Sequence, residues 1–187
     1  MSFPVFAFFQ IVYWLALATW FGGTLFVAIA APVVFRTVRE NDPVIPTVLS
    51  VNLEGQHGTL LAGSIVSNLI GRLAQIEWIC AVAVGVSIAV QWALHVQDWS
   101  IALVRTVLFV AAVVLLVYDR RFVWPKISRN RQQYIDHADE PEVANPAREQ
   151  FNRHQRESEM LLMIAVALLL GIIVFSTSIT NVRLLIQ

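Results

Sequence analysis

The chain has 187 residues, of which 57% are hydrophobic and only 14% are charged. Water-soluble domains carry about 25% charged residues, so this composition indicates a membrane protein. Its 13 basic and 13 acidic side chains leave no net charge, which argues against a nucleic-acid partner, because such a partner requires a concentrated basic face.

Four segments are long and apolar enough to cross a bilayer as helices, which takes about 20 residues. They are residues 5–35, 76–94, 101–118 and 160–179, with long connections at 36–75 and 119–159. The first segment is not a typical signal peptide, because basic residues do not precede it and its apolar run is too long. We predict one all-α domain, an integral membrane bundle of four transmembrane helices.

The first span carries two adjacent glycines, Gly22 and Gly23, although glycine in a helix interior costs about 1 kcal/mol relative to alanine in water. In lipid, small residues mark surfaces where helices approach closely. Ala18 and Gly22 are four residues apart, as are Thr19 and Gly23, and small residues continue toward Pro32. We predict that this surface receives a helix, either of the same bundle or of another protein or a second copy.

The first long connection divides into two parts. Residues 40–47 contain two prolines and predict a loop. In residues 58–72, Leu61, Ile65 and Leu69 repeat every four positions, which is a helical pattern. This stretch is too short to span, so we predict an interfacial helix before the second span, with a re-entrant segment as the alternative.

The second and third spans are separated by only a few residues, so they must form an antiparallel hairpin. Trp92 and Trp99 bracket the turn, as expected for aromatic side chains at a membrane surface.

Two charged residues lie at or inside these spans, where ionisable groups are usually functional. Glu77 opens the second span and is expected to pair with Arg72 or with an arginine of another segment. Arg105 lies one turn inside the third span and is expected to extend to the surface or to pair with Asp98.

The second long connection contains three prolines. We expect Pro125 to end the third helix, and Pro141 and Pro146 to break the middle of the connection. The mixed-charge stretch 152–160 favours a helix that extends the fourth span into the cytoplasm.

Eleven of the thirteen basic residues lie in the two long connections, which predicts that both connections are cytoplasmic and that both termini are not. They are Arg36, Arg39, Arg72, Arg120, Arg121, Lys126, Arg129, Arg131, Arg148, Arg153 and Arg156. The excess of arginine over lysine suits a bacterial plasma membrane.

The histidines argue against haem, because none lies inside a span and only His57 and His154, at span ends, could form a ligand pair. Cys80, Met160 and Met163 are soft ligands that would suit Cu(I), although methionine in an apolar helix usually fills space.

The acidic run Asp136, His137, Asp139, Glu140 and Glu142 lacks the spacing of a calcium or zinc site and is expected to be a solvated loop. No nucleophile–base, phosphate-loop or metalloprotease motif is present in the sequence. We therefore expect a non-enzymatic protein without a cofactor or metal.

Several short motifs occur in a recognisable order. They are an early tryptophan, Gly22–Gly23, the run from Pro32 to Arg36, the pair Ala62-Gly63, and a proline-rich loop before Phe151. In this order they resemble the transmembrane protein 205-like domain family, and the four-span layout matches over nearly the whole chain. The resemblance implies a four-helix membrane fold. That family has no firmly established activity, so it implies location more than function.

Abundant packing features without a catalytic motif predict an accessory or scaffold subunit of a larger membrane complex. Its partners would be the lipid bilayer and either other membrane subunits or further copies of the chain. The alternative is a small oligomeric transporter or efflux-related protein.

The orientation can be tested by cysteine labelling in a Cys80→Ser background. We expect a cysteine at Asp98 to react with a membrane-impermeant maleimide added outside intact cells, and a cysteine at Ser128 to react only after the membrane is opened. The reverse pattern would contradict the predicted orientation.

Overall fold

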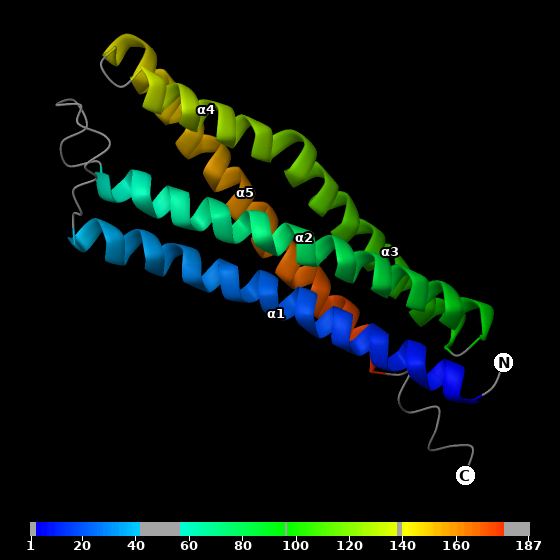
Figure 1. Cartoon of the computed structure of the whole chain (residues 1–187). Coiled ribbons are helices and arrows are strands. Elements are labelled where there is room, and N and C mark those ends of the chain that lie inside the picture. Colours follow the sequence, from blue (N-terminus) through cyan, green and yellow to red (C-terminus); the bar gives the residue numbers. More distant parts are fainter. Residues whose placement is uncertain (1–2, 42–56, 96, 138–139, 178–187) are drawn as a thin grey trace. The chain divides into compact units, whose positions relative to one another are not determined.

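The computed structural model describes residues 3–41, 57–95, 97–137 and 140–177 (Figure 1). Its regular elements are all helical, with no strand in these ranges. They are α1 (Phe3–Asn41), α2 (His57–Ala93), α3 (Trp99–Tyr118), the π-helix η2 (Asp119–Val123), α4 (Trp124–Asp136) and α5 (Pro141–Ser176).

Four helical stretches are long and apolar enough to cross a membrane, which confirms the predicted all-α class with four spans. These stretches are Phe6–Val38, Leu61–Ala93, Trp99–Asp136 and Glu142–Ser176. Each is longer than the span predicted from composition, because the helices continue into the polar connections. The helix predicted before the fourth span is part of α5.

The helix predicted at 58–72 forms, but as the first part of α2 and not as a separate element. The chain has no proline between Pro46 and Pro125, so nothing removes a backbone donor along α2. Gly71 alone costs only about 1 kcal/mol relative to alanine, too little to interrupt a long helix.

The expectation that Pro125 ends the third helix is wrong. Through η2, where the Trp124 N–H donates to the Asp119 carbonyl, the chain passes directly from α3 into α4. Pro125 follows directly after η2, so its missing N–H falls where the chain changes from the wider π-helical turn to the α-helix, and the helix continues through it.

The connection is interrupted before Pro141, between the end of α4 at Asp136 and the start of α5, as expected, but the break expected at Pro146 is wrong, because this residue lies inside α5. Pro141 is the first residue of α5, where proline is accommodated because an N–H there would have no intrahelical acceptor. Pro146 costs α5 only the hydrogen bond to the carbonyl four residues earlier.

The described residues group into two compact units. Unit 1 comprises those within Met1–Leu25, Leu73–Leu116 and Ile164–Gln187, and unit 2 those within Phe26–Arg72 and Val117–Met163. Parts of α1, α2, α3 and α5 belong to each unit.

Unit 1 is built around apolar side chains from all four of its helical segments. Its buried core consists of Tyr13, Leu17, Trp20, Cys80, Ala81, Val84, Ile88, Ala112, Leu116, Leu169 and Ile172. The start of α1, the α2–α3 turn and the end of α5 lie at one end of this unit (Figure 1). The predicted α2–α3 hairpin is confirmed, and the Trp92 indole donates to Thr106 Oγ1 across it at 2.9 Å.

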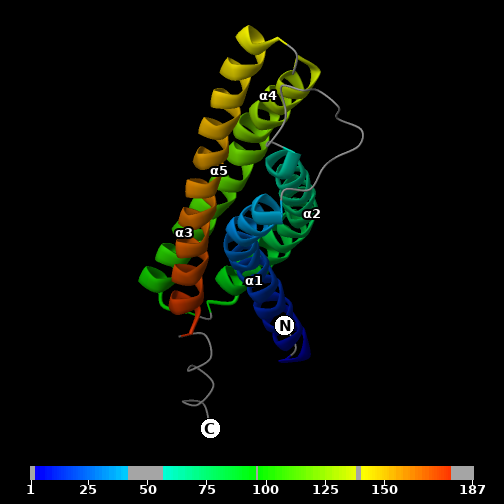
Figure 2. The same cartoon turned by 90° about the vertical axis from the view of Figure 1, so that its left-hand side faces the viewer.

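In unit 2, the end of α3 and α4 run beside the first half of α5 (Figure 2). Tyr118 donates to Glu157 at 3.1 Å and Ser158 donates to Asp119 at 2.8 Å. Arg120 donates to the Ile70 carbonyl at 3.1 Å, which attaches α2 to the same group. Polar contacts therefore join the helices of this unit.

Unit 1 offers a test of close helix packing at Gly85. A Cβ there would lie 3.2 Å from Phe109 Cζ, and the Phe109 ring packs edge-to-face on Trp20. We expect Gly85→Leu to lower the free energy of unfolding by about 1–3 kcal/mol, because the added atoms overpack this contact.

The matched control is Gly22→Leu, since a Cβ at Gly22 meets nothing within 4 Å. Thermal unfolding in detergent would compare the two variants. Equal losses in both would contradict the packing at Gly85.

Candidate functional site

The glycine-containing surface of α1 divides into two parts. A Cβ at Gly23 would lie 2.8 Å from Leu73 Cδ1, so this glycine packs against α2. Ala18, Thr19 and Gly22 are instead exposed. Pro32, also predicted as part of this surface, is exposed within α1.

The exposed side of α1 in unit 1 has large apolar residues before its small ones. Phe8, Ile11 and Leu15 are each about 60% exposed, at 62%, 60% and 64%. Ala18 and Gly22 continue their spacing of three and four residues, so all five share one helix face. This face is an apolar ridge that narrows to a notch at Ala18, Thr19 and Gly22, which we call the α1 notch.

Glu77 is buried inside α2 and is held against α1. The Thr24 hydroxyl lies 3.0 Å from Glu77 Oε1 and 2.7 Å from the Trp20 carbonyl, so it can donate to either acceptor. Both residues are almost inaccessible, with Thr24 at 0% and Glu77 at 5% exposure. The arginine partner expected for Glu77 stays a prediction.

Arg105 is fully buried in α3, so the expectation that it extends to the surface is wrong. Its guanidinium carbon lies 5.6 Å from the centre of the Tyr13 ring, and the two side chains also interact through the Tyr13 hydroxyl. Asp98 is exposed, and no ion pair joins it to Arg105 within the described ranges. Arg105 points inward because the second turn of α3 presents it to α1 and α2.

The Tyr13 hydroxyl forms a second buried contact, with Ser176 Oγ on α5 at 2.5 Å. The Ser176 hydroxyl also lies 2.5 Å from the Ile172 carbonyl of its own helix. Tyr13 thus connects α1 to α3 through Arg105 and to α5 through Ser176.

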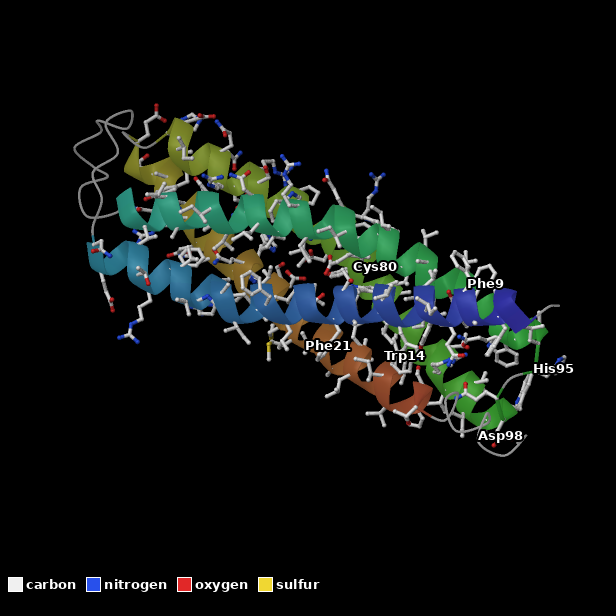
Figure 3. The ribbon with its side chains drawn as sticks, turned by 60° about the horizontal axis from the view of Figure 1, so that its bottom comes forward. Phe9, Trp14, Phe21, Cys80, His95 and Asp98 are labelled. Atoms are coloured by element: carbon white, nitrogen blue, oxygen red, sulfur yellow. The ribbon has the colours of Figure 1, made fainter. Side chains whose placement is uncertain are left out.

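A cavity of about 110 Å³ lies beside Arg105, near the α2–α3 turn. It is lined by Gln91, Trp92, His95, Gln97, Trp99, Ala102 and Arg105. His95 and Asp98 lie at this turn (Figure 3). Trp92 and Trp99, predicted at the membrane surface, pack edge-to-face with ring centres 4.8 Å apart.

Arg105 and Gln91, which both line this cavity, have buried atoms without a hydrogen-bond partner among the described residues: Nε and Nη1 of Arg105, and Nε2 and Oε1 of Gln91. A cation–π contact contributes about 0.5–2 kcal/mol, whereas removing a charge from water costs several kcal/mol even after relaxation. Tyr13 therefore does not compensate the Arg105 charge.

Sequence reasoning named Arg105 but did not single out Gln91, Tyr13 or Ser176. Gln91 lies two residues before the end of α2 and Arg105 six residues after the start of α3. Both lie within two helical turns of the α2–α3 turn, and this is a signal that could have placed them near each other. Tyr13 and Ser176 are 163 residues apart, and no local pattern relates them.

The candidate metal ligands do not come together in the part of the chain that the structure describes. No group of three or more His, Cys, Asp or Glu side chains is found there. Met160 and Met163 are exposed and Cys80 is buried. His154 contacts Glu157 at 3.2 Å, and the side chain of His57 lies outside the described residues. The expected absence of haem and metal stays a prediction.

The apolar exterior defines the class of protein. Ile79, Val107 and Val174 are among many large apolar residues that stay exposed on these helices. Such a surface suits contact with lipid and is unusual in water. With four helices long enough to span, these are the features of a multi-pass membrane protein.

Comparison with known proteins does not assign the chain to a family within this class. No family model, curated protein or solved structure matches the chain. The resemblance to the transmembrane protein 205-like domain family therefore rests on its short motifs and stays a prediction.

The Tyr13–Ser176 contact can be tested by a double-mutant cycle. Tyr13→Phe keeps the ring beside Arg105 but removes the hydroxyl, and Ser176→Ala removes the other partner. We expect a coupling of about 0.6 kcal/mol, and no more than about 1.7 kcal/mol, in the free energy of unfolding, since these are the average and the maximum for hydrogen bonds between membrane helices. Additive losses would show that this bond does not stabilise unit 1.

Proposed function

We propose that the chain is an accessory or scaffold subunit that acts by binding another membrane protein, or a second copy of itself, through the α1 notch. The observation that carries this proposal is the open position of Gly22, where a Cβ meets nothing within 4 Å. Gly23 beside it packs against Leu73, so the two neighbouring glycines have different surroundings.

The physical argument rests on how helices associate in lipid. Lipid tails are as apolar as leucine, so an exposed apolar face gives no driving force by itself. A notch of small residues between larger ones lets another backbone approach closely and gain dispersion contacts. Ala18 and Gly22, four residues apart, provide the spacing that this kind of crossing uses.

The membrane orientation that we propose follows from the distribution of arginine and lysine along the chain. The two arginine-rich connections would be cytoplasmic and both termini outside, in a bacterial plasma membrane. The resemblance to the transmembrane protein 205-like domain family agrees with a membrane role without an assigned activity.

A second candidate function is transport by a small oligomer. The observation in its favour is the pair of buried polar residues, Gln91 and Arg105, beside a cavity within the apolar helices. Polar groups inside membrane spans commonly mark substrate pathways. The cavity lies near one end of unit 1, and a pathway would have to continue beyond it.

Purification in nanodiscs, with mass determination and identification of co-purifying proteins, tests the first candidate. We expect a stoichiometric partner or a defined homo-oligomer that is lost in Gly22→Leu, because a leucine side chain would fill the notch. The unfolding temperature should change little, since Gly22 is open.

The matched control is Ala167→Leu, which enlarges an exposed small residue on α5. Loss of assembly in both variants would mean that added bulk alone is responsible. A monomer without partners would contradict the accessory role, and solute flux in proteoliposomes would then test transport.

A further inference from the structure

Arg105 and Gln91 bring three buried donor atoms and one buried acceptor atom to the lining of the cavity beside Arg105. Arg105 presents Nε and Nη1, and Gln91 presents Nε2, all buried and without a partner among the described residues. Gln91 Oε1 is the one acceptor among these four atoms. Buried donors are normally satisfied, so these three donor atoms call for an acceptor group that Arg105 and Gln91 do not themselves supply.

The positive charge of Arg105 indicates that the acceptor group is an anion. Arg105 remains a cation under all ordinary conditions, and it is fully buried. The described residues that line the cavity include no carboxylate, and the nearest acidic residue in sequence, Asp98, is exposed. Water would accept the hydrogen bonds but would leave the charge uncompensated, whereas an anion supplies both.

The cavity also limits the size of the ligand. A volume of about 110 Å³ holds a few water molecules, or one small polar group. His95 and Trp99 in its lining are exposed, so the cavity has a route to the surface near the α2–α3 turn. The group that enters can therefore be a free ion or the end of a larger molecule.

We propose that Arg105 and Gln91 bind a small oxyanion, a carboxylate or phosphate group, in the cavity near the α2–α3 turn of unit 1. Arginine and amide N–H groups are the usual donors to such oxygens, and a charge-assisted hydrogen bond is about twice as strong as a neutral one. Tyr13 would position the guanidinium through its ring face. The proposal does not depend on a membrane partner at the α1 notch.

The oxyanion has two possible sources, which the experiment separates. A free anion is tested by measuring the unfolding temperature of delipidated protein in neutral detergent against sodium phosphate or sodium acetate, with sodium chloride at equal ionic strength as the baseline. A lipid headgroup is tested by native mass spectrometry after exposure to phosphatidylglycerol, with uncharged diacylglycerol as the comparison.

Three variants locate the site. Arg105→Gln should weaken binding of whichever probe binds by at least about tenfold, which corresponds to about 1.4 kcal/mol. Arg105→Lys should weaken it less, because lysine keeps the charge but loses the planar set of donors. Arg121→Gln, which removes an exposed arginine of unit 2, should bind as the original chain does.

If Arg105→Gln does not fold, Gln91→Glu provides a second test of the site. It places a carboxylate in the cavity lining beside an intact Arg105, so the chain would supply its own anion. We expect this variant to fold and to lose its response to all the anionic probes.

Each outcome decides the proposal. Binding of phosphate or acetate that depends on Arg105 identifies a free oxyanion, and Arg105-dependent retention of phosphatidylglycerol alone identifies a lipid headgroup. The proposal is overturned if the original chain binds none of these probes. It is also overturned if either Arg105→Gln or Gln91→Glu binds a probe as tightly as the original chain does.

Discussion

Saturation of backbone hydrogen bonds is the constraint on which the rest of this structure depends. In hydrocarbon an unsatisfied N–H or C=O costs several kcal/mol, so each crossing segment must be one continuous helix. Pro141 begins α5, where no intrahelical acceptor is available for an N–H, and Pro125 follows the π-helical turn η2. Pro32 and Pro146 lie inside helices, where each removes one backbone bond.

The same constraint separates the polar side chains inside unit 1 into two kinds. Several hydroxyl groups donate to a carbonyl four residues earlier in their own helix: Thr24, Ser87, Thr106 and Ser176. A hydroxyl satisfied in this way needs no partner from another helix. Gln91 and Arg105 have more donors than a saturated helix backbone can accept, and their partners must come from outside their own helices.

Unit 1 therefore carries two features that its own packing does not account for. The α1 notch is apolar and open, and it suits close approach of another helix. The cavity near the α2–α3 turn has the buried polar side chains Arg105 and Gln91 in its lining, and it suits a small charged group. Because the two features share no residue, binding at one can be altered by mutation without removing the other.

The amino-acid sequence alone determined the number of spans, the all-α class and the α2–α3 hairpin, since these follow from apolar length and proximity along the chain. The sequence wrongly predicted helix breaks at Pro125 and Pro146, because a helix can continue through a proline when the loss of one backbone hydrogen bond is offset by packing. Only the tertiary structure decided which glycine is covered, that Arg105 points inward, and that Tyr13 meets Ser176. These outcomes depend on which faces of distant helices meet, and a residue's own neighbours in sequence do not specify that.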